Sequence, residues 1–253
     1  MDDTINRARR SDRQAVETLL CESYPAMHRI AHALAGDPKT APKIVHLVLR
    51  RAVLVMPRWR KGITPENWFY HHMLLTARGA SPLTVPIERD LLITAGPTGS
   101  PAYMAFIRAL RGLPRQQMEA FVLNHGEKLN SRLLGVSMDC STRAATVHFE
   151  AATQSLQTIA GESFDDLVAR FEQAYMTLTP PTTVIRTAVR REATVAIWAI
   201  RLRRLIRRLV AVSILALIGY AVWRWHPILL QWFDEIRSRT QTQSASAWLG
   251  SII

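Results

Sequence analysis

The sequence predicts an all-α protein: two small helical domains joined by a linker, followed by juxtamembrane helices and one transmembrane helix. Apolar residues recur at helical spacing over most of the 253 residues, and no segment alternates as a half-buried strand does. The stretch 209–223, LVAVSILALIGYAVW, carries no charge. The expected segments are a helical domain over 11–80, a linker over 81–101, a helical domain over 102–158, juxtamembrane helices over 162–208, a transmembrane helix over 209–225 and a tail over 226–253.

The first helical domain contains four apolar stretches. The second ends at Gly36-Asp37-Pro38 and the third near Pro57, as helices end at such residues. The stretches are Ala15, Val16, Leu19 and Leu20; Met27, Ile30, Ala31 and Leu34; Ile44, Val45, Val48, Leu49, Ala52 and Val53; and Trp68, Phe69, Met73, Leu74 and Ala77. Residues 79–101 are rich in Pro, Gly, Ser and Thr. They predict a linker with one short turn at 89–93, long enough for independent domain movement.

Residues 113–156 predict a compact helical unit that ends in a helix-turn-helix. Pro114 suits the first turn of a helix that His125-Gly126 closes. Asn130 and Ser141 are expected to cap the next two helices, with a turn at Asp139. On the last helix Ala145, Phe149, Ala152 and Leu156 form a buried stripe, which leaves Thr142, Arg143, Thr146, His148 and Glu150 facing outward. Two helices with a tight turn and an exposed second helix have the geometry that enters a DNA major groove.

This stretch resembles the promoter-reading C-terminal domain of bacterial sigma factors of the extracytoplasmic-function type. Leu113-Pro114-Arg115-Gln116 stands at the family's L-P-x-x entry. The apolar and capping positions are taken by Leu129, Leu134, Met138, Cys140, Ser141, Ala145, Phe149, Ala152 and Leu156. The resemblance implies that the upstream promoter element is contacted by Thr142, Arg143, Thr146 and His148.

The first domain resembles the clamp-binding and promoter-melting domain of the same sigma factors. The matching residues are Asp12, Ala15, Gly36-Asp37-Pro38, Ile44-Val45, Arg51-Ala52, Pro57-Arg58-Trp59-Arg60 and Trp68-Phe69-Tyr70. The resemblance implies that Val45, His46 and Leu49 lie against the RNA polymerase clamp. It also implies contacts with the melted promoter from Arg58, Trp59, Arg60, Lys61, Trp68 and Tyr70. Positive charge interleaved with aromatic rings suits the binding of unpaired bases. The sequence supports an alternative equally well, in which Trp59 and Trp68 are core residues and the arginines form a solvated surface.

The basic excess gathers in two places. Residues 1–80 hold 13 Lys and Arg against 7 Asp and Glu, and residues 186–208 hold 8 against 1. The second group directly precedes the apolar stretch, which favours anionic lipid headgroups over nucleic acid and places the N-terminal side in the cytoplasm. Fifteen helical residues span roughly 22 Å, and Arg207, Arg208 and Arg224 can extend this reach by snorkelling. An interfacial helix and a partner-binding hairpin are the alternatives.

The remaining segments carry less information. Residues 162–178 predict an amphipathic helix stopped by Pro180-Pro181, and residues 234–253 predict a mostly disordered tail.

Cys21 and Cys140 match no pairing or metal pattern and fit a reduced interior. His28 and His32 stand at i, i+4 without an evident third ligand, so no metal and no cofactor are expected. The sequence contains no P-loop, no G-x-S-x-G and no H-E-x-x-H, so it predicts no enzyme.

Together these patterns predict a membrane-tethered sigma-factor-like protein that directs transcription initiation from the inner membrane. Its expected partners are core RNA polymerase, promoter DNA and the bilayer, with an anti-sigma factor as a further candidate. The alternative is a degenerate sigma-fold interaction or scaffold protein without initiation activity. It is favoured by Lys43, His46 and Leu47, which replace the family's acidic docking residues. A simple DNA-binding repressor is less well supported, because residues 102–158 carry only 6 Lys and Arg against 4 Asp and Glu.

Overall fold

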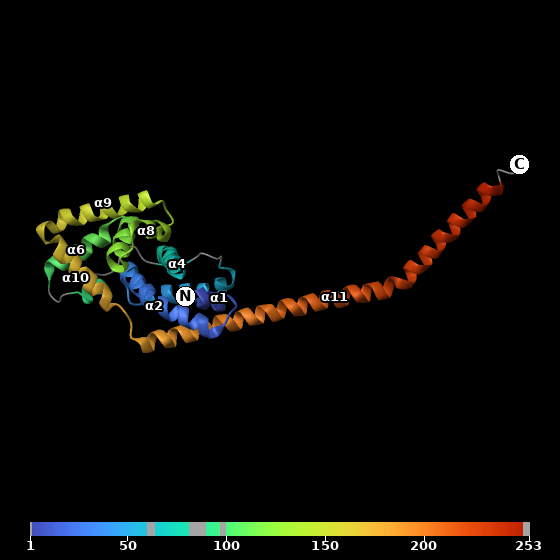
Figure 1. Ribbon diagram of the computed structural model, residues 1–253, viewed down its shortest axis with the longest axis horizontal. Coiled ribbons are helices and arrows are strands. Elements are labelled where there is room, and N and C mark those ends of the chain that lie inside the picture. The colour runs from blue at the N-terminus through green and yellow to red at the C-terminus, as the bar shows by residue number, and fades with distance from the viewer. Residues whose placement is uncertain (1, 60–63, 81–89, 97–99, 250–253) are drawn as a thin grey trace. The chain divides into compact units, whose positions relative to one another are not determined.

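The structure is a computed structural model that describes residues 2–59, 64–80, 90–96 and 100–249 (Figure 1). All regular elements within these ranges are helices, so the predicted all-α class is confirmed. The chain divides into two compact units, Met1–Trp198 and Ala199–Ile253. The boundary falls inside the last helix, α11 (Thr182–Leu249).

The first group of helices comprises α1 (Asp2–Arg9), α2 (Arg13–Ala35), α3 (Ala41–Val55), the short 3₁₀ helix η1 (Met56–Arg58) and α4 (Pro65–Ala80). The Asp12 carboxylate accepts a hydrogen bond from the Gln14 N–H at 2.9 Å and begins α2, which Gly36 ends in a left-handed conformation with φ 66°. Two apolar stretches that the sequence separates therefore lie on one 23-residue helix, which continues through Pro25. Their buried side chains make this helix the centre of the group.

The second group comprises α6 (Pro101–Gly112), α7 (Arg115–Phe121), the π-helical turn η3 (Val122–Gly126), α8 (Ser131–Met138), α9 (Thr142–Ala160), the short helix η4 (Gly161–Ser163) and α10 (Phe164–Thr177). The helix expected over 114–126 is therefore α-helical only to Phe121. Phe106, Phe121 and Phe171 pack edge to face or tilted and form the core of this group. In Figure 1, α9 lies over α6 and α8.

Two buried ion-pair clusters join the two groups directly. Glu119 of α7 is fully buried and accepts hydrogen bonds from Arg78 of α4 at 2.6 Å and from Arg115 at 3.3 Å. The hydrogen bonds that Arg78 donates to Glu119 raise the pKa of the Arg78 guanidinium. In the other cluster, Arg29 of α2 donates two hydrogen bonds to Glu127, at 3.0 and 2.9 Å. Breaking a buried pair from one side costs about 3–5 kcal/mol, so these contacts hold the groups together within the first unit.

The described part of the expected linker also packs against both groups. Residues 91–94 form the short helix α5 (Leu91–Thr94), which Asp90 caps at the Leu92 N–H, 2.9 Å away. The Leu91 N–H donates to the Gly36 carbonyl of the first group at 3.1 Å, and the Asp90 carboxylate accepts from Arg111 of the second at 2.7 Å. Arg89, the first residue of the turn expected at 89–93, lies outside the described residues. The division into two functional domains stays a prediction.

The helices expected over 162–208 correspond to α10 and the first part of α11. On α10, Phe164, Leu167, Val168, Phe171 and Tyr175 are buried as one stripe. The loop at Thr179, Pro180 and Pro181 then leads into α11. Residues 234–249 belong to α11 in the structure, where the sequence predicts mostly disorder. Residues 250–253 lie outside the described residues.

Candidate functional site

The turn between α8 and α9 has the local geometry that the sequence predicts. The Asn130 side chain accepts a hydrogen bond from the Leu133 N–H at 3.0 Å, and the Ser141 hydroxyl accepts one from the Ala144 N–H at 3.1 Å. Asp139 takes the left-handed conformation with φ 59° between the two helices. A Cβ atom at Gly135 would lie 3.0 Å from the Cys140 carbonyl oxygen, so a larger residue would have to push the turn away from α8 by a few tenths of an ångström.

The four predicted DNA-binding residues of α9 lie at different depths. Thr142 and Arg143 are exposed at the start of the helix, and Thr146 and His148 are half-buried. The Thr146 hydroxyl donates to the Thr142 carbonyl at 3.0 Å, so its proton is used inside the helix. Arg143 is the one Lys or Arg among the four. It lies beside a capped helix N-terminus, whose partial positive charge also favours phosphate.

The predicted promoter-melting residues are divided between surface and core. Arg58 is exposed, whereas Trp59 is only 2% exposed. The ring of Trp59 packs against those of Trp68 and Phe69, with centroids 5.3 and 6.1 Å away. Trp68 and Tyr70 are half-buried, and burial raises the pKa of Tyr70 to about 12. Arg60 and Lys61 lie outside the described residues.

The three predicted polymerase-binding residues lie on α3 and are mostly covered. Val45 and Leu49 are fully buried, and the His46 side chain is 40% exposed. His46 Nδ1 lies 3.4 Å from the Glu192 carboxylate of α11, an ion pair when the imidazole is protonated. The exposed large apolar residues of this helix are instead Leu47, at 55%, and Leu54, at 44%. The arrangement brings α11 to the helix that was expected to meet the polymerase.

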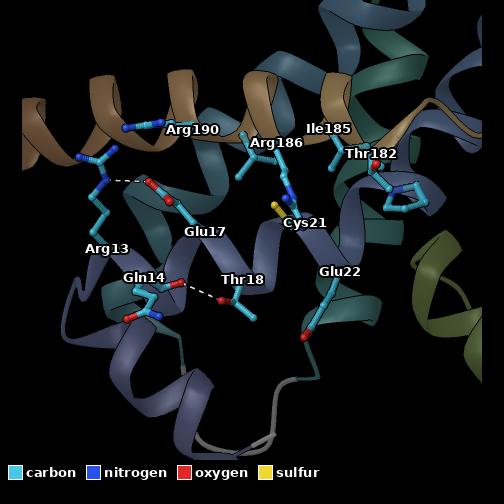
Figure 2. A pocket seen from close by; sticks show the side chains of 12 residues that line it. Arg13, Gln14, Glu17, Thr18, Cys21, Glu22, Thr182, Ile185, Arg186 and Arg190 are labelled. Carbon is cyan, nitrogen blue, oxygen red and sulfur yellow. Dashed lines mark hydrogen bonds and ion pairs between the residues drawn. The ribbon is translucent and has the colours of Figure 1, made fainter.

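A groove separates α2 from the first turns of α11 (Figure 2). It has a volume of about 810 Å³. Figure 2 shows Cys21 pointing from α2 toward α11 beside Arg186, while Arg13 pairs with Glu17 at 2.6 Å. The sequence gives no sign of this groove, because its two walls are about 170 residues apart along the chain.

Histidines 28 and 32 stack on each other within α2. Their ring centroids are 4.0 Å apart, and His28 Nδ1 lies 2.8 Å from the Leu178 carbonyl. His32 is 8% exposed, and burial, with the neighbouring His28, lowers its pKa to about 4. Across the described ranges no group of three or more His, Cys, Asp or Glu side chains is placed to hold a metal ion.

One helix in the described part of the chain is long and apolar enough to cross a membrane. It is α11, in which an 18-residue window reaches a mean hydropathy of 2.0. The side chains from Leu209 to Trp223 are exposed within the second unit. Exposed apolar surface of this extent is typical of a segment that contacts a membrane or another protein.

Similarity to known proteins is found among solved structures. No protein-family model and no curated protein matches the chain. Among solved structures, it is similar to the sigma factor RpoE in complex with the anti-sigma factor NepR from Bartonella quintana. The identity is 17%, the TM-score is 0.42, and the match covers 58% of this chain and 94% of that one. A similarity of this size assigns no function to the chain.

Proposed function

We propose that the chain is a membrane-attached sigma-factor-like protein that brings core RNA polymerase to promoter DNA. The observation that carries the proposal is the α8–α9 pair, whose tight left-handed turn and capped second helix leave Thr142 and Arg143 exposed. A helix presented in this way suits the major groove, where its N-terminal residues contact base edges. Thr146 and His148 complete the proposed promoter surface on the same helix.

The other proposed contacts come from the first group of helices. Arg58, Trp68 and Tyr70, with Arg60 and Lys61, would meet melted promoter DNA, since cationic and aromatic side chains together bind single strands. Trp59 belongs to the same predicted set, but its ring is 2% exposed and would have to leave the core to join them. Val45, His46 and Leu49 would face the polymerase clamp once this side of α3 is uncovered. An anti-sigma factor remains a candidate partner for the same surface.

The proposed location is the inner membrane, crossed once by residues 209–225. The exposed arginines 201, 203, 207 and 208 precede the apolar segment, and a cluster of this kind stays on the cytoplasmic side. The two helix groups would then lie in the cytoplasm with the polymerase and the DNA.

The proposal is tested by capture of core RNA polymerase on the full chain in mild detergent. We expect retention at moderate salt, and promoter-dependent transcription when a matching promoter is supplied. Arg143→Ala should lower that transcription and leave polymerase retention unchanged, because Arg143 is assigned to DNA alone. Absence of retention for both proteins at moderate salt would refute the proposal.

The second candidate is an interaction or scaffold protein at the membrane that has no initiation activity. It is favoured by the burial of Val45 and Leu49 and by the exposed Lys43 and Leu47, where the resembled family is acidic. If Arg143→Ala and Trp68→Ala leave promoter-dependent transcription untouched while a membrane partner is still bound, this second candidate is the better one.

A further inference from the structure

We infer that the first part of α11, residues 182–198, is an intramolecular cover that must leave α3 before a polymerase can bind there. This inference rests on the proposed function, because it names the regulation of the same α3 surface. We call residues 182–198 the cover helix. It belongs to the first compact unit, with α2 and α3.

The cover helix is buried along one side only. Val184, Val195 and Trp198 are 48%, 51% and 65% exposed on its other side. The buried residues recur at helical spacing, as expected for a docked amphipathic helix, and are Ile185, Val189, Ala193, Ala196 and Ile197. The cover helix therefore packs against the first unit through one defined apolar face.

One side chain at the rim of this face shows that the cover helix approaches α3. Glu192 reaches His46 of α3, and Leu49 and Val53 follow His46 at i+3 and i+7, which places the three on one side of α3. Leu49 is 0% and Val53 2% exposed. Two of the three proposed polymerase-binding residues therefore lie on the side of α3 that α11 approaches. The polymerase and the cover helix would compete for this side.

The cover is suited to being displaced. Two of its five buried residues are alanines, and the neighbouring groove to α2 is open and bordered by Arg13, Arg186 and Arg190. An interface with little buried apolar surface opens locally at lower free energy than a core. The cover helix and the apolar segment both belong to α11, which crosses the boundary between the two units.

The test compares two matched substitutions in the full chain in mild detergent. Val189 is fully buried and Val195 is 51% exposed on the same helix, so Val189→Asp should release the cover and Val195→Asp should not. Cys21 lines the groove beneath α11 (Figure 2) and reports release independently of any polymerase. A Cys140→Ala background leaves Cys21 as the one thiol, because the chain has two cysteines.

We expect Val189→Asp to raise both the alkylation rate of Cys21 and the retention of core polymerase by about tenfold, the factor that 1.4 kcal/mol of lost docking free energy gives. Val195→Asp should match the unmutated chain in both. Glu192→Lys, at the half-buried rim opposite His46, is a milder second variant with smaller increases of the same sign. Circular dichroism and a cooperative melt identify variants that are folded.

The possible outcomes separate the inference from the proposed function. Unchanged Cys21 alkylation in both folded variants overturns the cover. Faster alkylation with polymerase retention equal to that of the unmutated chain overturns the regulatory role and leaves the proposed function standing. If no form retains polymerase although Cys21 is released, the proposed function fails and the regulatory role with it.

Discussion

The side of α3 that α11 approaches and the outer side of α9 are both expected to bind partners, yet one is covered and the other is open. On α3, Val45 and Leu49 are fully buried. On α9, Thr142 and Arg143 are exposed although the helix packs against its neighbours along Ala145, Ala152 and Leu156. The difference follows from residue type. Apolar residues at helical spacing occur both in binding surfaces and in cores, so their pattern does not distinguish the two. Polar residues such as Thr142 and Arg143 are mostly found exposed, so they indicate a surface.

The covered side of α3 can be tested by measuring stability, and the open side of α9 by measuring binding. A residue of the covered side contributes to folding in the structure as it stands, so its removal changes the free energy of unfolding. A residue of the open side contributes little to folding, so its removal changes only what α9 binds. Substitutions on the two helices should therefore differ in kind as well as in size.

The largest expected effect is at Leu49. Leu49→Ala should lower the free energy of unfolding by about 2–5 kcal/mol, because it deletes a fully buried side chain and leaves a cavity. Leu47→Ala is the matched control on the same helix; Leu47 is 55% exposed, so its change should stay within about 0.5 kcal/mol. Urea unfolding of the full chain in mild detergent, followed by circular dichroism, measures both. Equal stabilities of the two variants would show that this side of α3 is not covered.

A smaller effect is expected from acid, at the buried His32 of α2. Burial, with the neighbouring His28, lowers the pKa of His32 from 6.5 to about 4, while the Asp37 carboxylate acts in the opposite direction. The unfolded chain therefore binds a proton at His32 that the folded chain does not. Stability is present above pH 6.5 and is lost as the pH falls toward 4. The loss by pH 5 is roughly 2 kcal/mol.

The variant that isolates this effect is His32→Leu, which removes the titrating group from α2. Urea unfolding at pH 7.5 and at pH 5 should give a smaller difference between the two pH values for the variant than for the unmutated chain. Some difference remains, because burial also lowers the pKa of His72 to about 4. An unchanged difference would mean that His32 is not responsible for the acid sensitivity.

Local features of the fold could be predicted from the sequence. Each cap, at Asn130 and at Ser141, involves a backbone N–H only three residues further along the chain, and the turn at Asp139 is equally local. All three are found where the sequence predicts them. The apolar stripes of α3 and α10 are likewise found buried. Helical spacing and capping are physical signals that a single segment carries.

Contacts between distant segments could not be predicted. Glu119 is at i+4 from Arg115, which suggests a surface pair, and nothing in the sequence indicates that Arg78 completes a buried cluster around it. Trp59 fits a stacking surface and a core residue equally well, and the structure places it in the core. The cover helix lies in a basic stretch, so its charges indicated lipid while its buried stripe packs against protein.

The smallest effect on folding, and the one that isolates the open side, is expected from Arg143. Arg143→Ala should change the free energy of unfolding by no more than about 0.5 kcal/mol, because the side chain is exposed at the first turn of α9. It should weaken binding to promoter-containing duplex DNA. If the guanidinium contacts a phosphate, the slope of log affinity against log salt should fall by about 1 and all sequences should be affected alike.

The sequence dependence of the same loss distinguishes a base contact from a phosphate contact. A bidentate contact with a base edge discriminates by about 1–3 kcal/mol, so Arg143→Ala would then lose affinity for the preferred duplex and keep its affinity for unrelated ones. Arg143→Lys is the matched variant. It keeps the charge and loses the planar fork, so it restores binding for a phosphate contact and fails to restore it for a base contact. Unchanged DNA affinity in both variants would leave α9 without its one basic contact, and the open side would then be better explained as a protein-binding surface.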